Sequence, residues 1–155
     1  MKKLAAAAVA LAAGVAVGGA AGARDVSHAA YAALLRQADA DVTKAETPVE
    51  HALQSRRTTV AHARRLMLAW ASTETALGRR FAAVRPPEPA AEKANRDLSR
   101  GELDLGAETR SLTLQAPTSS LKAFVAYLQR HNPKGGPEID HALAELKAAG
   151  YSTGG

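Results

Sequence analysis

Two short segments carry the spacing of carboxylate and imidazole groups that metal centres in helical proteins use. Glu138 and His141 stand three residues apart, as do Asp25 and His28. On a helix, residues at this spacing share one face. A di-iron bundle needs two Glu-x-x-His segments and two further inward glutamates, whereas only one such segment is present. We therefore expect a surface role for Glu138 and His141 and keep a metal site there as the alternative.

The sequence lacks the motifs on which common catalytic and phosphate-binding sites are built. It contains no Cys, which excludes disulfides, thiolate metal sites and a cysteine nucleophile. It has neither a Gly-x-Ser-x-Gly elbow nor a Gly-x-x-x-x-Gly-Lys loop. The acidic residues Glu102, Asp104 and Glu108 stand among arginines on a predicted helix, which is typical of a solvated face. The sequence predicts a protein that is not an enzyme, and it indicates no cofactor.

Arginines gather in one part of the chain. Residues 47–85 contain seven Arg against only two acidic residues, Glu50 and Glu74, whereas residues 86–116 are acidic overall. Either two oppositely charged helices lie side by side, or an exposed basic surface binds an anionic envelope polymer or a membrane. Nucleic acid is not expected, because no aromatic residues interleave the arginines. The candidate binding residues are Arg57, Arg64, Arg65, Arg79 and Arg80.

Two charged residues, Arg56 and Glu74, occupy positions where the helical pattern calls for apolar ones. The simpler expectation is that both side chains extend along the surface and reach water. If they are buried instead, each needs a partner on another helix. A buried polar layer of that kind would fix the helix register and could mark a ligand cavity.

The elements that must position these residues are helices. Apolar residues recur at alternating spacings of three and four from Val49 to Val84, and strand-like alternation is nearly absent from the chain. The segment 47–50, Thr-Pro-Val-Glu, has the pattern of a capping box. These signals predict one long helix over Thr47–Val84. Further helices are predicted over Ser27–Ala45, Pro89–Gln115, Leu121–His131 and from Pro137 to a left-handed cap at Gly150.

Prolines between Arg85 and Ala90 must interrupt the chain, so the helices on either side are expected to pack as an antiparallel hairpin. Three leucines spaced by seven, Leu98, Leu105 and Leu112, form the seam expected to pack on the Thr47 helix. Gly101 and Gly106 fall near the level of Trp70, and we expect them to make room for its indole. Whether the first two helices form a kink or a hairpin stays open.

Residues 1–23 have the three parts of a secretory signal peptide: Lys2 and Lys3, an apolar run, and the small residues Ala21-Gly22-Ala23. This pattern predicts cleavage before Arg24, a helical domain over 24–151 and a flexible tail over 152–155. The alternative is an uncleaved anchor, because the uncharged stretch is close to the length that spans a bilayer. Both interpretations place the remaining chain outside the cytoplasm, in the periplasm or secreted.

The segment Leu112-Thr113-Leu114-Gln115 resembles the Leu-Thr-x-x-Gln repeat of small periplasmic helical chaperones, which clasp unfolded chains in a basic, dimeric cradle. The likeness covers four residues, is one position short of the repeat and has no second copy here. The resemblance implies a chaperone-like helical protein as one interpretation.

Together these patterns predict an all-α bundle of about five helices with a long central hairpin. We expect a non-enzymatic interaction or structural protein of the bacterial envelope. Its expected partner is an anionic envelope polymer or membrane surface, another protein, or a second copy in a homodimer. The alternatives are a metal- or small-ligand-binding bundle and a chaperone-like protein.

Overall fold

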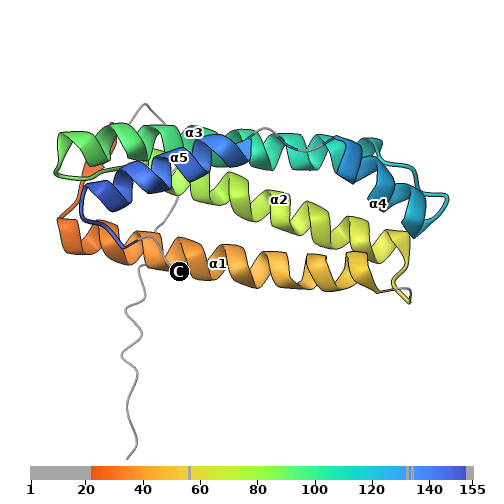
Figure 1. The fold of residues 1–155 in the computed structure, drawn as a ribbon. Helices are drawn as coiled ribbons and strands as arrows, with labels where there is room; N and C mark the ends of the chain where they lie inside the picture. Colours follow the sequence, from red (N-terminus) through yellow and green to blue (C-terminus); the bar gives the residue numbers. More distant parts are fainter. Residues whose placement is uncertain (1–21, 56, 132, 134, 153–155) are drawn as a thin grey trace, which may run out of the picture.

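The computed structural model describes residues 22–55, 57–131, 133 and 135–152, which form five α-helices and two very short strands. Most of the predicted signal peptide, Arg56 and residues 153–155 lie outside the described residues. The prediction of an all-α bundle of about five helices is confirmed, and Figure 1 shows the helices lying side by side. The elements are β1 (Arg24–Asp25), α1 (His28–Gln54), α2 (Val60–Ala82), β2 (Val84–Arg85), α3 (Pro89–Gln115), α4 (Leu121–Arg130) and α5 (Gly135–Ala148).

The long helix predicted over residues 47–84 was wrong, because two helices share this segment. α1 continues through Pro48 to Gln54, and the Thr47 hydroxyl donates to the Thr43 carbonyl at 2.8 Å instead of capping a helix. α2 begins after Thr59, whose hydroxyl oxygen accepts from the backbone N–H of His62 at 3.2 Å. Pro48 lies at an exposed position, where water can satisfy the carbonyl that its missing N–H leaves free. α1 and α2 therefore form a hairpin joined at residues 55–59.

Small residues bring α2 and α3 close together. A Cβ on Gly78 would lie 2.7 Å from Leu103 Cγ, and one on Gly106 would lie 2.8 Å from the Ala71 carbonyl oxygen. Gly101 instead faces α5, where an added Cβ would lie 2.8 Å from Ile139 Cγ1. The prediction that Gly101 and Gly106 make room for Trp70 was therefore wrong, because they allow close helix contacts.

The α3 face toward α2 is a buried stripe of small and polar residues at spacings of three and four, here called the polar stripe: Ser99, Glu102, Gly106, Thr109 and Thr113. Because this stripe meets α2, the leucine seam is rotated away from it. Leu98 is buried in the core, whereas Leu105 and Leu112 are only partly buried and line cavities. The antiparallel hairpin is formed as predicted, but the seam is not its main contact.

Two apolar clusters divide the bundle along its length. One contains side chains from α1, α2, α3 and α5, including Leu35, Phe81 and Leu146. The other lies toward α4 and includes Val49 and Phe124. α1 packs mainly on α2, and α5 packs on α3, as Figure 1 shows.

The end of the bundle near the α2–α3 turn is closed by a network of polar contacts, here called the end network: His28, Tyr31, Glu88, Asn95 and Tyr151. β1 pairs in parallel with β2 beside it, with Arg24 opposite Val84. Gly150 has a φ of 91°, and the Tyr151 N–H bonds the Leu146 carbonyl at 3.0 Å, which confirms the predicted left-handed cap. The cap turns the Tyr151 ring into the cluster that contains Leu146.

Candidate functional site

The strongest candidate site is a cavity of about 270 Å³ between α1, α2, α3 and α5, here called the first cavity. Apolar side chains such as Leu35, Val42 and Leu143 form much of its wall, and Trp70 borders it. Among its described lining residues there is no Lys, Arg or His. The acidic residues that line it are Asp39, Glu46, Glu74, Glu102 and Asp140.

Glu74 and Glu102, here called the central pair, are brought together by the close approach of α2 and α3. Glu74 is 2% exposed and Glu102 is 6% exposed. The expectation that Glu74 reaches water was therefore wrong, and so was the placement of Glu102 on a solvated face. Glu74 belongs to the buried stripe of α2, and Glu102 to the polar stripe of α3. The carboxyl groups consequently meet inside the bundle.

The environment of the central pair changes the acidity of Glu102. Burial, followed by a hydrogen bond with Glu74 and the charge of Glu74, raises the pKa of Glu102 to about 9. Two carboxyl groups form a hydrogen bond only when one of them holds a proton. Because Glu102 keeps its proton at neutral pH, its carboxyl group donates the hydrogen bond to Glu74.

Several polar atoms beside the cavities have no partner. Oε2 of Glu102, Nε1 of Trp70 and Oγ1 of Thr109 are buried without a hydrogen bond. Glu46, on α1, also borders the first cavity, and its pKa is raised by partial burial and by the charges of Glu50 and Glu74. Buried polar atoms normally find partners, so these groups are candidates for contact with a bound molecule or water.

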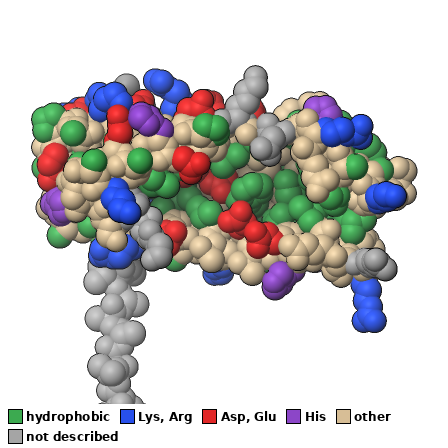
Figure 2. All heavy atoms as spheres, viewed as in Figure 1, with side chains coloured by type: hydrophobic (Ala, Val, Ile, Leu, Met, Phe, Trp, Pro, Cys, Tyr) green, Lys and Arg blue, Asp and Glu red, His purple; other side chains and the backbone are tan. Residues whose placement is uncertain are grey.

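A second cavity of about 270 Å³ adjoins the first, and both are bordered by Trp70 and Glu46. Its wall is mainly apolar and includes Val49, Leu53, Met67, Leu112 and Leu128. In Figure 2, hydrophobic side chains line a hollow between α1 and α5, with acidic side chains among them and at its edge. The two cavities therefore belong to one open side of the bundle.

The predicted arginine surface is divided along α2. Arg57 is exposed in the α1–α2 connection, Arg64 and Arg65 lie near the start of α2, and Arg79 and Arg80 lie in its last turn. Arg65 and Arg79 are about 21 Å apart along the axis, at ~1.5 Å per residue. The structure thus brings Arg64 and Arg65 to one end of the helix and Arg79 and Arg80 to the other.

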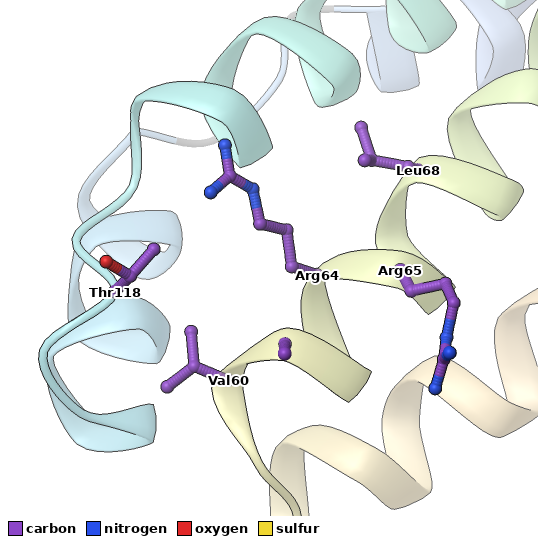
Figure 3. Close-up of a pocket in the computed structure, with 6 residues that line it drawn as sticks. Val60, Arg64, Arg65, Leu68 and Thr118 are labelled. Atoms are coloured by element: carbon purple, nitrogen blue, oxygen red, sulfur yellow. The ribbon is translucent and has the colours of Figure 1, made fainter.

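Three of these arginines already have protein partners. Arg64 donates to the Leu114 carbonyl at 3.1 Å, and Arg65 Nη2 lies 3.0 Å from His62 Nδ1. Arg80 forms an ion pair with Asp41 at 2.8 Å. Figure 3 shows the Arg64 and Arg65 side chains diverging around an open pocket that Val60 and Thr118 also line.

The predicted metal pair lies on the surface. Glu138 and His141 are exposed on α5, and His141 Nε2 is 3.5 Å from Glu145 Oε1. In the described part of the chain, no group of three or more His, Asp or Glu residues is arranged to hold a metal ion. Among the described residues, the structure therefore arranges no third ligand with this pair to hold a metal ion.

Sequence reasoning missed Glu102, Glu46 and the role of Trp70 as a border between cavities. A signal for Glu102 was present, because the polar stripe repeats at the same spacing as an apolar helix face. Small residues at Ser99 and Gly106 flank Glu102 in that stripe, as expected where two helices approach closely. A search for periodic apolar residues alone does not find a buried helix face of this kind.

Comparison with known proteins supplies no further guide: no protein-family model, no curated protein and no solved structure matches this chain. The described helices include none long and apolar enough to cross a bilayer. Function must therefore be inferred from the chemistry of the cavities themselves.

Proposed function

We propose that this protein is an exported, non-enzymatic binding protein that takes a small organic cation into the first cavity. The observation that carries the proposal is the central pair: two carboxyl groups in contact, buried beside a cavity whose described lining contains no base. A buried charge is costly unless an opposite charge or several hydrogen bonds compensate it. A bound cation would supply that compensation.

The character of the wall favours an organic ammonium group over a metal ion. Divalent metals require several converging oxygen or nitrogen ligands, and no three of the His, Asp or Glu residues in the described part of the chain are arranged to hold an ion, although Asp39, Glu46 and Asp140 also line the cavity. An ammonium group also gains from the face of an indole, and Trp70 borders the cavity. The volume lies just below the ~300–1,000 Å³ of typical ligand sites, which favours a small molecule.

The other sequence-based interpretations have weaker structural support. An anionic polymer would need a continuous basic surface, whereas the candidate arginines lie at two ends of α2 and several are engaged. A metal at Glu138 and His141 would need ligands from outside the described residues. Export, to the periplasm or the medium, is proposed from the signal-peptide pattern of residues 1–23.

The experiment is a titration of the purified protein with hexylammonium, hexanoate and hexanol at neutral pH. Trp70 is the only Trp in the chain, so its fluorescence reports binding, and calorimetry gives the affinity independently. We expect hexylammonium to bind and hexanoate to bind at least tenfold more weakly. Glu74→Gln should weaken hexylammonium binding by about tenfold or more, because it removes the charge of the pair.

The matched control is Glu138→Gln, which removes an exposed acid of α5 outside the described cavity linings. It should bind hexylammonium like the unaltered protein. Circular dichroism on each variant verifies that the helices remain folded. Equal affinity for hexylammonium and hexanoate, or a folded Glu74→Gln variant with unchanged affinity, would refute the proposal.

A further inference from the structure

The second cavity lies next to the first and shares two lining residues with it. Trp70 and Glu46 line both cavities, so the two cavities meet at these two side chains. The wall of the second cavity includes apolar residues from three helices: Leu53 of α1, Leu112 of α3 and Leu128 of α4. All three are only partly buried, which leaves apolar surface accessible next to the cation site.

The acidic lining of the two cavities determines which kind of amphiphile can bind there. Although the whole chain has a formal net charge of +5, the described lining of the two cavities contains acids and no bases. A fatty acid or another anionic amphiphile would be repelled by this lining, whereas an amphiphile with a positive head group would be attracted. The acids are Asp39, Glu46, Glu50, Glu74, Glu102 and Asp140.

The two cavities offer complementary environments. The first has two nearly fully buried carboxyl groups, whereas the acids that line the second, Glu46 and Glu50, lie on α1 at partly or fully exposed positions. A positive group therefore gains most at the central pair, and an apolar chain gains most beside Leu112 and Leu128. The Trp70 indole between them can contact both parts.

We infer that the ligand is a cationic amphiphile, with an ammonium head at the central pair and an alkyl chain that passes Trp70 into the second cavity. This inference rests on the proposed function and adds the chemical class of the ligand. The second cavity supplies affinity through burial of methylene groups, and the central pair supplies selection for positive charge.

The test is a chain-length series of butyl-, hexyl-, octyl- and decylammonium, used below micelle-forming concentrations. Trp70 fluorescence and calorimetry measure the dissociation constants. Affinity should rise about threefold to fourfold for each methylene and reach a plateau once the chain fills the second cavity. Octanoate should show no comparable gain over butanoate.

A matched pair of variants on α3 tests whether the alkyl chain of the ligand lies in the second cavity. Leu112→Asn places a polar group in the second cavity, whereas Leu114→Asn alters a leucine that is 48% exposed and outside the described lining. Leu112→Asn should reduce the gain per methylene while leaving butylammonium affinity nearly unchanged, and Leu114→Asn should behave like the unaltered protein. Leu53→Ser on α1 makes the same test if Leu112→Asn fails to fold.

The outcomes separate this inference from the proposed function. Butylammonium binding that depends on Glu74, without any gain for longer chains, overturns the inference and leaves the proposed function standing. Absence of binding by every ammonium compound refutes both. Light scattering adds one further outcome: a dimer that Leu112→Asn dissociates would show that a second copy covers these cavities, which also overturns the inference.

Discussion

Two groups of polar side chains, the buried central pair and the partly buried end network, differ in how well their hydrogen bonds are satisfied. In the end network, the Tyr31 hydroxyl donates to Asn95 Oδ1 at 2.8 Å. Asn95 Nδ2 in turn donates to the carbonyls of Phe81 at 2.9 Å and Val84 at 3.1 Å. In the central pair, one Glu102 oxygen has no partner and no base compensates the charge among the described lining residues.

The remaining polar groups of the end network are also paired. The Tyr151 hydroxyl donates to Glu88, His28 Nδ1 lies 2.9 Å from the same carboxylate, and the His28 and Tyr151 rings stack at 4.1 Å. The hydrogen bond from Tyr151, followed by the one with His28, lowers the pKa of Glu88. These groups hold together segments that are about sixty residues apart in the chain.

The difference teaches how to distinguish a structural polar group from a ligand site. A buried polar network whose members are all paired contributes to a unique fold, whereas a partly satisfied one is a local cost. Such costs are characteristic of functional sites. Among the described residues, the buried side-chain atoms without a partner are Trp70 Nε1, Glu102 Oε2, Thr109 Oγ1 and Thr113 Oγ1, and none belongs to the end network.

The largest effect is expected in the end network. Asn95→Ala leaves the Tyr31 hydroxyl and two backbone carbonyls without their partner, so the free energy of unfolding should fall by about 3 kcal/mol. Urea denaturation measures this change, and hexylammonium affinity should stay the same. Gln115→Ala on the same helix is the control, because its amide is exposed and its loss should cost under about 0.5 kcal/mol. Similar small losses for both variants would show that the end network is not structural.

Replacing the central pair should raise the stability of the fold, whereas Asn95→Ala lowers it. In the double variant Glu74→Met/Glu102→Leu, apolar side chains take the place of a costly buried charge, so stability should rise by ~1–4 kcal/mol. Hexylammonium binding should be abolished in the same protein. Urea denaturation and calorimetry test both halves of this expectation. A less stable double variant would mean that the pair supports the fold, and the contrast with the end network would disappear.

Much of the architecture can be predicted from local signals. The prolines before Ala90, the hydroxyl cap before Leu121 and Gly150 each act within a few residues, and each lies at an element boundary in the structure. The break between α1 and α2 could not be found this way. Apolar residues continue in helical phase from Val49 to Val60, which hides the cap at Thr59.

The candidate site was less predictable, because it depends on contacts between helices. Glu74 and Glu102 are 28 positions apart, and each has a sequence environment that equally fits an exposed acid. Their burial follows from the close α2–α3 approach at Gly78 and Gly106, which is a property of the pair of helices and of neither helix alone. The sequence shows Glu74 as an interruption of the apolar stripe and Glu102 as a member of the repeating polar stripe, but it does not show that the two residues meet.

The smallest effect concerns pH and compares the central pair with the end network directly. The pKa of Glu102 is about 9 in the folded protein, above its ordinary value in the unfolded chain. A raised carboxyl pKa contributes stability that is complete below the ordinary pKa and is lost as pH rises through the folded one. Glu46 shifts in the same direction. Stability should therefore fall by about 1 kcal/mol between about pH 6.5 and 7.5.

Urea midpoints at these two pH values, with an unchanged slope, provide the measurement. In Glu102→Gln the loss should largely vanish, because the neutral amide has no proton to release. In Asn95→Ala it should persist, because the carboxyl group of Glu102 is unaltered. The lowered pKa of Glu88 acts only in more acidic solution, where its stabilising effect is lost as pH falls. If the pH dependence of stability persists in Glu102→Gln, another group titrates in this range, and the claim that Glu102 holds a buried proton at neutral pH is contradicted.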